Sequence, residues 1–312
     1  MPLPFILGGL ALVAAGYGVK KGIDAFDADC EADEFIKKAE SLKEEATKKV
    51  ESAQSDRKLA LARFGEKKLH VLSHSVSNFL DHFHRLNRSR ITIEGINMQD
   101  IQGQVSDARK ITNQLNASGI DGDSVLGVFA GFGSLGISSF TTGAMLGGGL
   151  TASGLAGMAV LGGLVAGPAL AILGAVRADE MEEKLEKAKA YHSQVEEAVK
   201  KADAMIDNLR AVEKMAKSFT RQIAKLDALF FSLSQDAIAT MKKHNYDTSR
   251  YNQKERDQIS VTVSTLSTLS PFLKVPIMDE HQKLNKKAID ALNLIRKQIN
   301  DLENRHDDDK TS

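Results

Sequence analysis

The chain has 312 residues with 41 basic and 41 acidic side chains, so its formal net charge is zero. This balance argues against a protein that binds nucleic acids by neutralising phosphates, and we expect no nucleic-acid partner. Cys30 is the single cysteine, which excludes an intramolecular disulfide and leaves no cysteine pair for a metal.

The N-terminal segment, residues 1–23, is predicted to be an apolar anchor. An uncharged run from Phe5 to Val19 is followed by two lysines. A secretory signal carries its positive charge ahead of the apolar run, so we interpret this segment as retained, with a cleaved signal peptide as the alternative. The run is short for a bilayer crossing, so we expect either an interfacial anchor or a third apolar element that packs on the hairpin described below. We expect it to contact lipid through its first large side chains, Phe5, Ile6 and Leu7.

Residues 24–122 are predicted to form the first half of a helical bundle. From Ala32 to Phe64, apolar residues recur at alternating steps of three and four, which is typical of one face of a long helix. Gly65 is expected to break this helix. A second amphipathic helix then runs to about Leu86, a polar connection follows at residues 87–97, and a third helix runs from Ile101 to Leu115.

The middle of the chain, residues 123–177, differs sharply in composition. Between Asp123 and Arg177 lie 53 residues without a charge or a histidine, and they hold 14 of the 24 glycines. A bilayer core about 30 Å thick needs roughly 20 apolar residues per helical crossing, so this charge-free run has the length for two crossings. Gly147–Gly149 predict the turn of a helical hairpin, with arms near residues 124–146 and 150–176.

This hairpin is expected to bury large apolar side chains in lipid and to pack its arms through glycines. Several glycines lie four residues apart, the spacing that lets two membrane helices approach closely. The predicted membrane-inserting residues are Leu126, Phe129, Phe132, Leu135, Phe140, Leu155, Leu161, Leu164 and Leu170, and the predicted packing residues are Gly127, Gly131, Gly143, Gly147, Gly157, Gly163 and Gly167. The alternative is a hairpin sheathed by amphipathic helices, which we also expect as one of two states of the protein.

Residues 178–304 are predicted to form the second half of the bundle, and residues 305–312 an acidic, disordered tail. Helical spacing continues from Asp179 to about His244 without proline or glycine, and its apolar face includes Leu229 and Leu233. At 1.5 Å per residue one helix of that length is about 100 Å long, and we expect a bend somewhere along it.

Shorter elements are expected to complete this half. They are a turn at Tyr246–Asn252, a helix at Gln253–Leu269, a loop at Pro271–Pro276 and a last helix at Glu280–Leu302 that buries Leu284, Ala288, Ile289, Leu292, Ile295 and Ile299.

Two motifs invite a catalytic or cofactor-binding interpretation, and both fail in context. Gly131 to Gly136 have the G-x-G-x-x-G spacing of a dinucleotide site, but no acidic residue follows until Asp179. His70 and His74 are spaced for a metal, but the glutamate of H-E-x-x-H is missing and no third ligand is identifiable. We therefore expect no enzyme, no cofactor and no metal.

The order of elements resembles that of a known class. Long amphipathic helices flank a charge-free hairpin, as in the α-helical pore-forming toxins of the cytolysin A and haemolysin BL type and, more distantly, in the apolipoprotein L group. The resemblance covers the layout of the whole chain, and it implies a helical bundle that shelters the hairpin and releases it at a membrane. The apolar N-terminus departs from it, so we expect membrane association on the cytoplasmic side rather than secretion.

The sequence thus predicts an all-α, elongated bundle with a central glycine-rich hairpin that inserts into a bilayer and forms a pore or permeabilises it. The alternative is a non-catalytic, membrane-anchored coiled-coil scaffold for a membrane-remodelling complex. The expected partners are a lipid bilayer and either further copies of the chain or another helical protein.

Overall fold

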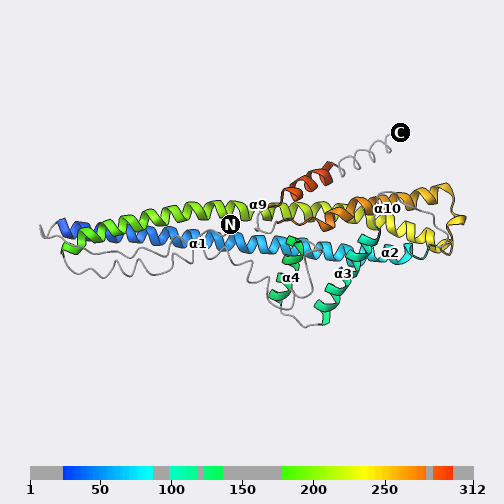
Figure 1. Cartoon of the computed structure of the whole chain (residues 1–312), viewed down its shortest axis with the longest axis horizontal. Helices are drawn as coiled ribbons and strands as arrows, with labels where there is room; N and C mark the ends of the chain where they lie inside the picture. The colour runs from blue at the N-terminus through cyan, green and yellow to red at the C-terminus, as the bar shows by residue number, and fades with distance from the viewer. Residues whose placement is uncertain (1–23, 87–97, 118–121, 136–177, 279–283, 298–312) are drawn as a thin grey trace. The chain divides into compact units, whose positions relative to one another are not determined.

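The computed structural model describes residues 24–86, 98–117, 122–135, 178–278 and 284–297, and these residues are folded as helices and their connections (Figure 1). No strand occurs within these ranges; one isolated bridge pairs Met278 with Leu284. The all-α class predicted from the sequence is confirmed. The elements are α1 (Asp24–His70), a π-helical turn η1 (Val71–Val76), α2 (Ser77–Phe83), α3 (Met98–Ala117), α4 (Gly122–Leu135), α9 (Ala178–Lys243), a 3-10 turn η4 (Thr248–Arg250), α10 (Gln253–Lys274) and a helix at residues 286–297.

The described residues fall into two compact units, and α1 and α9 each contribute to both. In the first unit, residues 24–55 pack against residues 178–209. Much of the seam is alanine, including Ala32 and Ala188, both fully buried, and the small side chain lets the helices lie close together. The ammonium of Lys184 lies 2.9 Å from the carboxylate of Asp33 and ties the two helices together beside this seam.

The second unit contains the main core. Side chains from α1, η1, α2, α3, α4, α9, α10 and residues 286–297 form one buried cluster. The Phe64 and Phe219 rings lie 5.6 Å apart between α1 and α9, a distance at which aromatic pairs attract. Close by, the Lys67 ammonium lies 2.8 Å from the Asp227 carboxylate, so the same two helices are also joined by an ion pair that is largely buried.

Two predicted helix ends were wrong. Gly65 does not break α1, which continues to His70. Pro271 lies inside α10, which ends at Lys274, although an interior proline costs a helix about 3 kcal/mol. The two residues after it, Phe272 and Leu273, are buried in the core, and each such burial contributes roughly 1.5 to 3 kcal/mol. Tertiary packing therefore offsets the local cost of the proline.

Two predicted apolar faces need correction. Leu229 is 38% exposed and Leu233 is only partly buried, whereas Phe230 is fully buried. At this level α9 packs against α2 as well as α10, and the Phe230 ring contacts Phe79 of α2. The buried face of α9 therefore includes Phe230 rather than Leu229.

In the last helix Ala288, Leu292 and Ile295 are buried as predicted. Ile289 is 38% exposed, so the buried face is narrower than the list of apolar residues implied.

Other predicted elements are confirmed with shifted bounds. The third helix is present as α3, and the long helix predicted from Asp179 is present as the 66-residue α9. The turn before α10 contains Asn245 and Tyr246 at positive φ, and it ends in a capping box in which Asn252 and Glu255 satisfy each other's backbone N–H groups. The N-terminal anchor, the polar connection at 87–97, most of the hairpin and the acidic tail lie outside the described residues.

Candidate functional site

The candidate site is α4, which is the described beginning of the charge-free run. Its residues are helical and its apolar side chains face the core of the second unit, with Val128 and Phe132 buried. Phe129 and Ala130 are partly buried against the same cluster. The first turns of the predicted membrane segment therefore lie docked against the helical core.

Two glycines allow α4 to approach α1 backbone to backbone. A Cβ atom built on Gly65 of α1 would lie 2.8 Å from the backbone nitrogen of Gly133 and closer still to the carbonyl oxygen of Phe129. A Cβ atom built on Gly133 would lie 3.0 Å from the backbone nitrogen of Gly65 and closer to the carbonyl oxygen of Leu61. Real Cβ atoms do not come this close to backbone atoms, so glycine is required on both helices.

A fully buried lysine lies next to this contact on α1. The Lys68 ammonium donates a hydrogen bond of 2.9 Å to the carbonyl oxygen of Val275 and lies 4.3 Å from the centre of the Phe64 ring. Among the described residues its partners are thus a carbonyl group and an aromatic face rather than a carboxylate. Burial lowers the pKa of Lys68 to about 7, because the charged form loses its hydration.

The end of α4 is also held by the segment that follows α10. The backbone N–H of Met278 donates to the carbonyl oxygen of Ser134 across 3.2 Å. Val275, which accepts the hydrogen bond from Lys68, lies three residues earlier. The residues just after α10 therefore contact both α1 and α4.

The structure describes only part of the predicted site. Phe132 lies in the core and Phe129 at its edge, whereas Leu126 is partly exposed. A Cβ atom at Gly127 would meet nothing within 4 Å, and Gly131 is buried. The side chain of Leu135, the anchor residues Phe5, Ile6 and Leu7, and the site residues from Phe140 to Leu170 lie outside what is described, so their roles stay predictions. Within the described ranges, no helix has both the length and the apolar character needed to cross a bilayer.

Gly65, Gly133, Lys68 and Met278 were missed as site residues, and Gly65 carried a signal. A glycine inside a helix costs about 1 kcal/mol relative to alanine. An isolated glycine such as Gly65 in an otherwise regular helical pattern therefore indicates a close contact with another element as an alternative to a helix break. Lys68 is one of two adjacent lysines, and nothing in the pattern shows that it is buried while Lys67 pairs with Asp227. Met278 contributes a backbone group, which carries no sequence signal.

The described histidines do not assemble a metal site. The rings of His70 and His74 stack at 4.5 Å, but no group of three potential ligands forms anywhere in the described part of the chain. His82 contacts the hydroxyl of Tyr246 at 2.8 Å, and His84 contacts Gln102. The two rings therefore have different partners.

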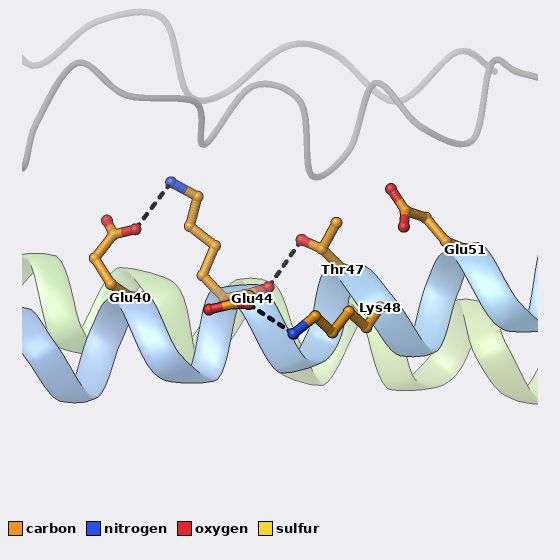
Figure 2. A pocket seen from close by; sticks show the side chains of 6 residues that line it. Glu40, Glu44, Thr47, Lys48 and Glu51 are labelled. Carbon is orange, nitrogen blue, oxygen red and sulfur yellow. Dashed lines mark hydrogen bonds and ion pairs between the residues drawn. The ribbon is translucent and has the colours of Figure 1, made fainter.

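A polar face of α1 lines a shallow hollow in the first unit. Glu40, Glu44, Thr47, Lys48 and Glu51 lie along this face (Figure 2), and Glu40 also accepts a hydrogen bond from the hydroxyl of Tyr191 in α9. Lys48 and Glu44 pair at 2.6 Å, and this hydrogen bond lowers the pKa of Glu44. Glu44 and Lys48 are exposed and lie four residues apart on one helix, the spacing of ordinary ion pairs on a helix surface.

The described part of the G-x-G-x-x-G motif, residues 131–135, belongs to α4 and not to the turn after a strand that a dinucleotide site requires. Val125 to Ala130, which would have to form the preceding strand, are helical.

Comparisons of the chain with protein-family models, with curated proteins and with solved structures found no match. The site is therefore interpreted from its own geometry.

Replacing Gly65 by alanine is expected to undock α4. The added methyl group would collide with backbone atoms of Phe129 and Gly133, and overpacking of this kind costs about 1 to 3 kcal/mol. The matched control is Gly103→Ala in α3, where nothing lies within 4 Å and alanine should stabilise the helix by up to about 1 kcal/mol. Urea unfolding and hydrogen exchange of residues 122–135 measure both variants. Equal effects of the two substitutions would contradict the close contact.

Lys68 is expected to make the stability of the second unit depend on pH. Its pKa is about 7 in the folded protein and 10.5 in the unfolded chain, so the unfolded chain binds more protons between these values and stability rises with pH across that window. Relative to Lys68→Met, the parent protein should gain up to about 1.4 kcal/mol per pH unit between pH 7.5 and 9.5. Urea titrations at several pH values measure this difference. Parallel pH curves would show that Lys68 keeps its ordinary pKa.

Proposed function

We propose that this chain associates with a lipid bilayer and inserts its charge-free run, with docked α4 marking the state before insertion. The observation that carries the proposal is the junction at α4. The 53-residue run has the length for two membrane crossings. Its first helix nevertheless packs against the apolar core of a bundle whose other helices carry many charged residues. A run of this kind needs a partner for its apolar surface, and a bilayer supplies one.

The docking energy of α4 is of a size that a membrane can overcome. Val128 and Phe132 are its two buried large side chains, and each contributes roughly 1.5 to 3 kcal/mol. A few kcal/mol keep α4 docked in nearly all molecules in water. Transfer of two apolar arms into lipid offers more apolar burial than this, so the bilayer favours the undocked state.

An arginine in the middle of the second predicted arm tests the proposal. Leu161→Arg is expected to cost about 2.5 to 3.5 kcal/mol on insertion, which is roughly a hundredfold loss of partitioning into liposomes. Leu161→Met is the matched control and should partition as the parent does, because it remains apolar. Flotation of the full-length protein with liposomes is the measurement. Equal flotation of all three proteins would rule out insertion of this arm.

Dye release from the same liposomes separates the two functions that the sequence left open. Permeabilisation predicts leakage that Leu161→Arg abolishes. A membrane-anchored scaffold predicts flotation without leakage, and in that outcome the charge-free run serves as an anchor alone.

A further inference from the structure

We infer that residues 275–278 form a strap that holds α4 against α1, and that release of this strap is the step that frees α4. The strap follows α10 directly and belongs to the second unit, together with every element that it contacts. Its role in membrane insertion rests on the function proposed above. Its action on α4 is independent of any membrane.

Local sequence explains why the strap is not helical. Pro276 disfavours a helical conformation in the residue before it, and Val275 accordingly leaves the helical region, with φ −57° and ψ 121°. The helix therefore ends at Lys274, whose ammonium pairs with Asp100 of α3 and fixes the point where the strap begins. Backbone groups beyond this point have no helical partner and are available to other elements.

The strap uses these backbone groups to join three elements. The carbonyl oxygen of Val275 accepts from Lys68 of α1 at 2.9 Å, and the N–H of Met278 donates to Ser134 of α4 at 3.2 Å. The carbonyl oxygen of Ile277 accepts from the N–H of Asn285 at 2.8 Å, just before the last helix. A four-residue segment thus bonds α1, α4 and the last helical region to one another.

One side chain anchors the strap in the core. Ile277 is fully buried, whereas Val275 and Met278 are only partly buried at the edge of the same cluster. Withdrawal of Ile277 from the core would release the hydrogen bond that the next residue, Met278, donates to Ser134. What would then hold α4 is the glycine contact and two buried side chains, Val128 and Phe132.

Hydrogen exchange of the full-length protein in water tests the strap, with two matched isoleucine substitutions. Ile277→Ala should accelerate exchange of residues 122–135 by about tenfold or more, while residues 210–243 of α9 change less than about twofold. Ile259 is equally buried but lies in α10, and Ile259→Ala should affect α9 and α10 without a preference for α4. Unchanged exchange in α4 of Ile277→Ala, or acceleration of α4 and α9 together, would overturn the inference.

A crosslink gives a second test that does not depend on weakening the core. In a Cys30→Ser background, Ser134→Cys with Met278→Cys ties the strap to α4, and oxidation should slow exchange of α4 relative to the reduced form. The control pair, Thr240→Cys with Gln258→Cys, replaces side chains 3.0 Å apart on α9 and α10 and should leave α4 unchanged. Faster or equal exchange of α4 in the oxidised strap variant, with the crosslink confirmed by mass, contradicts a holding role.

Liposomes then separate failure of the strap from failure of the proposed function. The strap-locked protein should lose flotation and dye release until it is reduced, while the oxidised control pair keeps both. If neither protein floats even when reduced, the membrane function fails, and the exchange data still decide the strap. If the locked protein inserts fully, release of the strap is not needed for insertion and the inference fails.

Discussion

The contact between Gly65 and Gly133 is the constraint on which the docking of α4 depends. Because neither residue has a Cβ atom, the backbones of α1 and α4 touch, and this brings Val128 and Phe132 within reach of the core. Larger residues at the crossing would hold the helices apart and leave both side chains short of their neighbours. The cost of one glycine inside a long helix, about 1 kcal/mol, is offset by the packing that it permits.

Two more features operate close to this contact. The buried ammonium of Lys68 donates a hydrogen bond to the carbonyl oxygen of Val275 in the strap. The strap in turn donates a backbone hydrogen bond from Met278 to Ser134 at the end of α4. A charge without a carboxylate partner is an expensive group to bury, so this corner of the core is less stable than its apolar contacts alone suggest. Docked α4 is thereby held by several weak contacts rather than by one strong one, which is compatible with the release proposed above.

Much of the fold was predictable because it depends on local patterns. The steps of three and four from Ala32 to Phe64 predicted the buried face of α1, and the absence of proline and glycine predicted the length of α9. The end of α10 was misplaced at Pro271, because burial of Phe272 and Leu273 outweighs a proline in the last turn. The exposure of Leu229 was not predicted. A long helix packs against different neighbours at different points, so the side of the helix that is buried changes along it.

By itself, the sequence determined the all-α class, the long amphipathic helices and the length and charge-free character of residues 124–176, since each of these follows from composition and spacing along the chain. Only the tertiary structure decided that Gly65 is a packing residue rather than a helix break, that Lys68 is buried while Lys67 is paired, and that residues 275–278 reach α4. These three depend on contacts between residues more than 60 positions apart in the sequence, and no local pattern identifies a partner at such a distance.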